Sequence, residues 1–139
     1  VANRYVALHT TIYSMNPKIG SVITAQCPSA MTYAITSVPF ESRTIPESYI
    51  MLRDVVKVGL EVRFNNQPEI GRLLSEKHPV LIVENDCVLT TGKTTLEAFD
   101  RLEVLEFTAK SLLQLTDLGE FNAIDEARIR ELDNKFFKD

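Results

Sequence analysis

The turn sequence Thr91-Gly92-Lys93-Thr94 carries residue types that bind phosphate in many proteins. In a phosphate-binding loop, backbone N–H groups and the lysine contact the phosphate oxygens, and the hydroxyl group that follows binds a magnesium ion. The earlier glycine that completes this pattern is absent from the residues before the turn. We therefore do not expect this turn to bind a nucleotide.

Histidine and cysteine, which serve most often as metal ligands and catalytic groups, are scarce in this chain. His9 lies among apolar residues, which favours a hydrogen-bonded packing role over a ligand role. His78 precedes a proline, and we interpret it as a solvated loop residue. Cys27 and Cys87 are too few for a disulfide framework and are typical of reduced thiols in a packed interior.

The stretch 79–99 joins the elements that would position these groups. Residues Val80–Val83 are apolar and mostly β-branched, which predicts a strand buried on both faces. A polar step at 84–86 separates it from a second strand that begins at Cys87 and runs into the turn at Gly92. A hydroxyl residue shortly before Glu97 predicts a capped helix start.

The spacing of apolar residues, together with proline and glycine residues that end helices and strands, predicts the remaining elements. Strands are predicted at 21–26 and 55–58, and a surface loop at 38–46; residues 48–52 are ambiguous. Helices are predicted within 3–15, 29–36, 64–77, 96–115 and 125–137. The charged residues of the long helix indicate a solvated face; they are Glu97, Arg101, Glu103, Glu106 and Lys110. Alternating strands and helices predict a layered α/β domain.

Composition excludes several classes of function. The chain has 139 residues, enough for a single domain with one core, and its net charge is −4. An acidic chain without a basic stripe argues against nucleic-acid binding. No apolar run approaches the roughly 20 residues that span a bilayer, so we expect a protein without membrane contact, located in the cytoplasm.

Two stretches of the chain resemble the class II aldolase/adducin family. In the first, a strand runs into Asn85-Asp86-Cys87 and then Gly92-Lys93-Thr94, where the family has Asn-His-Gly and a Gly-Lys-Thr turn. In the second, His9-Thr10-Thr11-Ile12-Tyr13 precedes the strand at 21–26, where the family has His-x-x-Ile-Tyr and then Val-His-x-His. The resemblance covers nearly the whole chain. It implies a three-layer αβα fold with a mixed central sheet, as one domain over residues 1–139 that lacks the family's N-terminal segment.

The resemblance also implies where the family's catalytic groups would lie. Family members hold zinc with three histidines, whose positions fall here on Thr24, Gln26 and Asp86. The family's proton-transferring glutamate falls near Tyr5. Threonine and glutamine are poor zinc ligands, and one aspartate does not hold a catalytic zinc alone. We therefore interpret the metal site as vestigial, with neither metal nor cofactor bound and no catalytic residue retained.

Three further residues are candidates for lining this vestigial site. Asn85 keeps the family's residue type, and Cys27 and Cys87 fall next to the former ligand segments. In this fold the two cysteines could approach each other and, with Asp86, form a substitute site for a soft metal. We favour the simpler interpretation that they are small apolar residues filling the space of lost histidines.

The resemblance leaves two functions open. The first is an aldolase-like domain that has lost its zinc-dependent lyase activity and serves assembly, ligand binding or regulation. The second is an active zinc-dependent aldolase or epimerase acting on a sugar phosphate, its site completed by another segment or subunit. In both cases the resemblance implies a homo-oligomer and a sugar-phosphate-like small molecule as a ligand.

Overall fold

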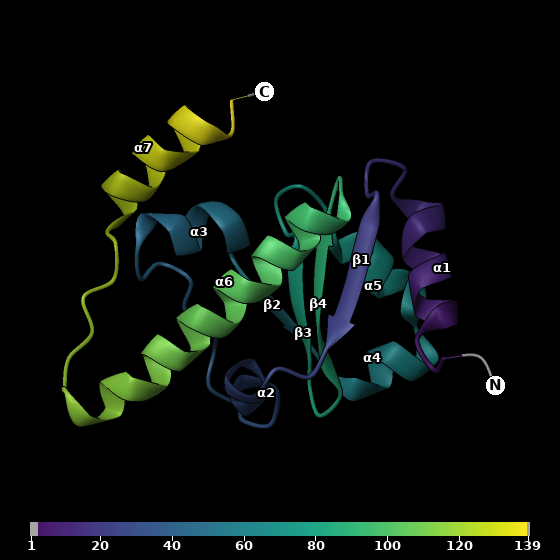
Figure 1. Ribbon diagram of the computed structural model, residues 1–139, viewed down its shortest axis with the longest axis horizontal. Helices are drawn as coiled ribbons and strands as arrows, with labels where there is room; N and C mark the ends of the chain where they lie inside the picture. Colours follow the sequence, from purple (N-terminus) through teal and green to yellow (C-terminus); the bar gives the residue numbers. More distant parts are fainter. Residues whose placement is uncertain (1–2, 139) are drawn as a thin grey trace.

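The computed structural model describes residues 3–138 as a mixed sheet flanked by helices (Figure 1). The strands are β1 (Ser21–Ala25), β2 (Val56–Val58), β3 (Val80–Val83) and β4 (Cys87–Gly92). The helices are α1 (Val6–Met15), α2 (Pro28–Ala34), α3 (Pro46–Leu52), α4 (Leu60–Asn65), α5 (Gln67–Leu73), α6 (Thr95–Gln114) and α7 (Glu126–Phe136), with a short 3₁₀ turn at Leu115–Asp117. Among residues 3–138, no helix has the length and apolar character needed to cross a membrane.

The four strands form one sheet in the order β1-β4-β3-β2. Strand β4 pairs antiparallel with both β1 and β3, whereas β2 pairs parallel with β3. The two central strands are buried along their whole length, as their apolar residues predict. The sequence-based expectation of a mixed central sheet in an α/β fold is therefore confirmed.

Each face of the sheet supports its own apolar core. On one face α1 and α5 pack on the sheet through residues such as Leu8 and Ile70, together with Leu81 of β3. On the other face α2, α3 and α6 pack through residues such as Leu52 and Leu105, together with Ile82 of β3. Alternate residues of β3 thus enter different cores, and the fold has three layers (Figure 1).

The start of α6 is capped as the sequence predicts. The Thr94 hydroxyl accepts a hydrogen bond from the Glu97 N–H at 3.2 Å. The Glu97 carboxylate in turn accepts one from the Lys93 N–H at 2.6 Å. This reciprocal arrangement satisfies N–H groups that have no partner within the helix, and it fixes the direction in which α6 leaves β4.

One helix was not predicted from the sequence, and one local expectation was wrong. Helix α4 has no counterpart among the predicted elements, and the long helix does not present a simple solvated face. The Glu106 carboxylate accepts hydrogen bonds from the backbone N–H groups of Ser29 and Ala30, both at 2.9 Å, at the start of α2. The Arg101 side chain is only 17% exposed, and its guanidinium donates to the backbone carbonyl groups of Met51 and Thr91. Both side chains hold elements together rather than meeting only solvent.

Candidate functional site

Asp86 lies in the tight turn between the two central strands. Asn85, just before it, adopts a left-handed backbone conformation with φ of 56°, which asparagine tolerates better than most residues. The Asp86 N–H donates to the Val83 carbonyl at 3.2 Å, which closes the turn. This turn directs the Asp86 side chain into the protein, where the residue is only 6% exposed.

The structure brings together the three positions that the resemblance assigns to metal ligands. The pairing of β1 with β4 places Thr24 opposite Leu89, and Gln26 follows at the end of the same strand. The Gln26 side-chain amide donates to the Asp86 backbone carbonyl at 2.8 Å. The Thr24 hydroxyl lies 3.3 Å from Nε2 of His9. The positions that the resemblance assigns to one site are therefore neighbours, and their side chains already have protein partners.

Two arginines and a tyrosine surround the Asp86 carboxylate. Nε of Arg63 lies 2.6 Å from Oδ2, and Nη2 of Arg4 lies 3.4 Å from Oδ1. The Tyr5 hydroxyl donates to Oδ1 at 3.2 Å. Tyr5 stands near the position that the resemblance assigns to the catalytic glutamate, and it is a neutral hydrogen-bond donor here.

The Arg63 guanidinium is held in place on several sides. Its Nη2 donates to the Arg4 carbonyl at 2.9 Å. The guanidinium carbon lies 4.8 Å from the ring centres of both Tyr5 and Phe64. The Arg63 side chain is 5% exposed and that of Asp86 is 7% exposed, so the pair is shielded from water. The contact between Arg63 Nε and Asp86 Oδ2 is an ion pair without hydrogen-bond geometry. Neither of these two atoms has a hydrogen-bond partner.

The surroundings suppress ionisation of the groups beside this pair. Burial, with a further contribution from the Asp86 charge, raises the pKa of the Cys87 thiol to about 12. Burial, with the nearby Cys87 and Asp86, also raises the pKa of the Tyr5 hydroxyl. Burial lowers the pKa of His9 below its ordinary value of 6.5. A neutral thiol, a neutral phenol and a neutral imidazole make this site poor in nucleophiles.

These residues do not fit a zinc ion. Within residues 3–138, no three His, Cys, Asp or Glu side chains gather in a way that could hold a metal. Cys87 packs in the core that contains α1, whereas Cys27 packs against the core on the opposite face of the sheet. The substitute site built from Cys27, Cys87 and Asp86 therefore does not form in this structure. Asn85 is exposed at the turn, next to the buried Asp86.

Arg63 and Arg4 are the site residues that the sequence did not predict. Arg63 lies in α4, which was not expected, and its neighbours carry no pattern that marks it as buried. The available signal was indirect: an aspartate directed into an apolar turn needs a cation nearby, because an unpaired buried charge is very costly. That argument predicts a cationic side chain near Asp86, but it does not identify the residue as Arg63.

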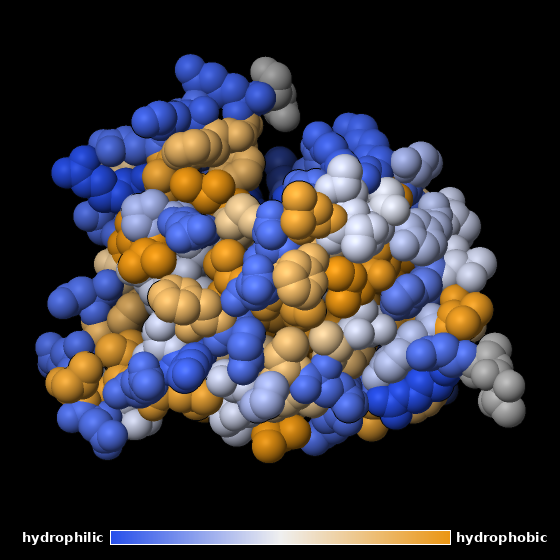
Figure 2. Space-filling view, viewed as in Figure 1, coloured by the Kyte–Doolittle hydropathy of each residue, from blue (hydrophilic) through white to orange (hydrophobic). Residues whose placement is uncertain are grey.

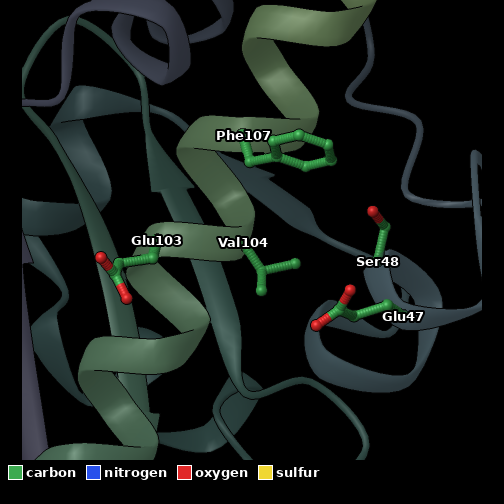
Figure 3. Close-up of a pocket in the computed structure, with 5 residues that line it drawn as sticks. All are labelled: Glu47, Ser48, Glu103, Val104 and Phe107. Carbon is green, nitrogen blue, oxygen red and sulfur yellow. The ribbon is translucent and has the colours of Figure 1, made fainter.

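A shallow hollow of about 400 Å³ between α3 and α6 lies apart from these residues (Figure 3). Its lining residues are Glu47, Ser48, Glu103, Val104 and Phe107. The Ser48 hydroxyl is hydrogen-bonded to the Thr108 hydroxyl at 2.7 Å in the interior, and no histidine lines the hollow. This arrangement lacks the base that would activate a serine nucleophile.

Known proteins that are similar to this chain point to one family. The model of the class II aldolase and adducin N-terminal domain matches residues 2–113. The putative aldolase/epimerase/decarboxylase YgbL from Escherichia coli has a structure similar to this chain, with a TM-score of 0.80, 20% identity, and coverage of 91% of this chain and 63% of that one. The same protein from Klebsiella pneumoniae has a TM-score of 0.76 with the same identity and coverage.

An L-fuculose 1-phosphate aldolase from Glaciozyma antarctica PI12 is also similar in structure, with a TM-score of 0.74 and 19% identity over 92% of this chain and 49% of that one. Identities this low establish a shared fold only, and the chain spans less than two thirds of the length of these neighbours. A search of curated proteins found no match. The family model, which covers most of the chain, shows that this protein belongs to the class II aldolase and adducin family.

Proposed function

We propose that this chain is a class II aldolase-like domain without zinc-dependent lyase activity, which serves assembly, ligand binding or regulation. The observation that supports this proposal best is the contact between Arg63 and Asp86. The one acidic side chain among the three former ligand positions has a guanidinium nitrogen 2.6 Å from its carboxylate. A carboxylate already paired with a buried cation is a weak ligand for a second cation.

The two other former ligand positions support the same proposal. Zinc in proteins binds thiolate, imidazole or carboxylate groups, and its ligands must be deprotonated. Thr24 offers a neutral hydroxyl that already contacts His9, and Gln26 offers an amide that already donates to the Asp86 carbonyl. A dication at this position would displace these contacts and repel Arg63. The donor set is thus unsuited to the electrophile that lyase chemistry of this family requires.

The competing function is a metal-dependent aldolase or epimerase acting on a sugar phosphate, with its site completed by another segment or subunit. It is motivated by length, because the chain spans 63% of the YgbL structures and 49% of an L-fuculose 1-phosphate aldolase. In this alternative, further ligands join Asp86, and Arg63 has to leave the carboxylate.

Metal content separates the two functions. The purified, unchelated protein is loaded with zinc, desalted and measured by elemental mass spectrometry. We expect far less than one zinc per chain, and the same value in Asp86→Asn and in the matched surface variant Asp54→Asn. About one zinc per chain in the wild type and in the Asp54 variant, lost in the Asp86 variant, would refute the proposal.

A cleavage assay tests the same proposal through the reaction. L-fuculose 1-phosphate is a suitable probe because a structural neighbour is an aldolase of that name. We expect no aldehyde to be released above the uncatalysed rate, with or without added zinc. Zinc-dependent release that Asp86→Asn abolishes would support the competing function instead.

We further propose that the chain forms a homo-oligomer and takes a sugar-phosphate-like ligand, as its family suggests. Size-exclusion chromatography with light scattering checks the first proposal, and a monomer at all concentrations would contradict it.

We also propose a cytoplasmic location, because Cys27 and Cys87 are free thiols in separate cores. Recovery of the protein from the oxidising exterior of the cell would contradict this location.

A further inference from the structure

A second site-like feature lies at the end of the sheet opposite to Asp86. A groove of about 1120 Å³ runs between α7, the end of β4 and the segment that follows α1. Figure 2 shows the hollow at the upper edge of the molecule, beside the lobe that carries α7. It is lined by six cationic side chains, which are Lys18, Arg53, Lys77, Lys93, Arg101 and Lys138.

The groove is positively charged although the whole chain is acidic. Among residues 3–138, three carboxylates line it, and each is already paired with one of the cations. Asp133 pairs with Arg53 at 2.8 Å, Glu97 with Arg101 at 2.8 Å, and Glu76 with Lys93 at 3.8 Å. Within residues 3–138, Lys18 and Lys77 have no carboxylate at ion-pair distance. The excess charge is therefore available to an anion from outside.

Arg101 is oriented by the fold toward this groove. Its Nε donates to the Met51 carbonyl at 3.1 Å, its Nη1 to the Thr91 carbonyl at 2.5 Å, and its Nη2 to Glu97 at 2.8 Å. A guanidinium has five N–H groups, so these three contacts leave two donors. A cation fixed by three bonds loses little conformational freedom when an anion binds to the remaining donors.

Arg53 adds a second guanidinium and an unusual backbone. Its φ of 56° and ψ of −155° lie in a region that is nearly restricted to glycine. The side chain, 13% exposed, contacts the Phe137 ring at 3.6 Å from the ring centre and donates to Asp133 Oδ1 at 2.8 Å. The Tyr49 hydroxyl donates to the same oxygen at 3.0 Å. The backbone at Arg53 is therefore in a costly conformation, and its side chain is fixed on the groove wall by Asp133 and Phe137.

We propose that this groove binds a small molecule carrying two or more phosphate groups. Two guanidinium groups and flanking lysines suit several oxyanions at once, because arginine matches phosphate geometry and lysine adds point charges. The groove is slightly larger than the usual range of small-molecule pockets, and Phe136, 51% exposed on its wall, can contact an apolar part of the ligand. This proposal does not depend on the state of the Asp86 site.

Inorganic pyrophosphate is the probe, and binding is measured by isothermal titration calorimetry at low salt. The test variant is K18Q/K77Q, because both side chains are exposed. The matched control is K110Q/R130Q, which removes the same charge from exposed positions outside the groove. We expect saturable binding that weakens about tenfold in K18Q/K77Q and less than about twofold in the control.

Amide and arginine side-chain shifts in two-dimensional NMR locate the bound probe. We expect the largest changes at Gly92, Lys93 and the Nε–H groups of Arg53 and Arg101. Three results would each overturn the proposal: no saturation at millimolar pyrophosphate, equal weakening in the two double variants, or shifts concentrated around Asp86. Zinc content is measured separately, so failure here and failure of the proposed function are distinguishable.

Discussion

Asp86 and Arg63 show how a single pair of residues sets the character of a site. Both side chains are almost fully shielded from water, so each charge depends on the other. Removing one partner from a buried pair leaves an uncompensated charge, which is far more costly than the pair is stabilising. The pair therefore governs both the stability of the turn and the ability of Asp86 to accept another cation.

The first prediction concerns this pair. Arg63→Met is expected to lower the free energy of unfolding by about 3 kcal/mol, because Asp86 remains buried with only the exposed Arg4 nearby. Arg63→Met combined with Asp86→Asn should lose clearly less, since no charge is then left alone. Urea denaturation measures both, with Arg72→Met on the exposed surface of α5 as the control. Wild-type stability in the single variant would contradict the interpretation.

The second prediction concerns His9. Its pKa in the folded protein is below 6.5 because burial disfavours the charged imidazole. As pH falls, the unfolded chain therefore takes up this proton first, and the contribution of neutral His9 to stability is lost below about pH 6.5. Unfolding free energies measured from pH 8 to pH 5 should fall less steeply in His9→Gln than in the wild type. Parallel profiles would show that His9 does not titrate in this way.

At the scale of elements, the ends of helices carry much of the specific polar bonding. The start of α6 is closed by Thr94 and Glu97, and the start of α2 is closed by Glu106 from another helix. The cap at the start of α6 is local, because Thr94 and Glu97 are close in sequence. The cap at the start of α2 joins α2 to α6 and orients the segment that follows Gln26.

The third prediction tests the local cap. Thr94→Ala is expected to destabilise the protein by about 1 kcal/mol, because the Glu97 N–H loses its acceptor at the start of the helix. Thr95→Ala is the matched control: it removes the same hydroxyl group one residue later, where it makes no cap, and should leave stability nearly unchanged. Thermal unfolding followed by circular dichroism compares the two. Equal effects would show that Thr94 does not act as a cap.

At the scale of the whole molecule, one sheet separates two apolar cores. The same strand, β3, supplies alternate side chains to both, so neither core can lose its packing without disturbing the strand that they share. This arrangement predicts that the two layers unfold together. It also places the Asp86 turn and the cationic groove at opposite ends of the β3–β4 strand pair.

The fourth prediction tests this coupling with neighbouring residues. Leu81→Ala opens a cavity in one core and Ile82→Ala in the other, and each should cost about 2–5 kcal/mol. Both side chains are fully buried, which makes them a matched pair. We expect a single unfolding transition in each variant, with coincident tyrosine fluorescence and circular dichroism. Separate transitions in either variant would show that the layers fold independently.

Local patterns in the sequence predicted much of the fold. The apolar run at Val80–Val83, the leucine spacing of the long helix and the hydroxyl residue before Glu97 each correspond to an observed element or cap. These features depend on residues within one turn or one strand, so the sequence alone determines them. The family resemblance further predicted that Thr24, Gln26 and Asp86 belong to one site, and the structure places these residues near one another.

Only the tertiary structure decided what surrounds those positions. Arg63 reaches Asp86 from a helix that the sequence did not predict, and the cationic groove collects lysines and arginines from segments far apart in the chain. Charged residues carry no periodic signal that separates a solvated side chain from a buried one. Their partners are chosen by contacts between distant segments, and those contacts exist only once the sheet and its helices are assembled.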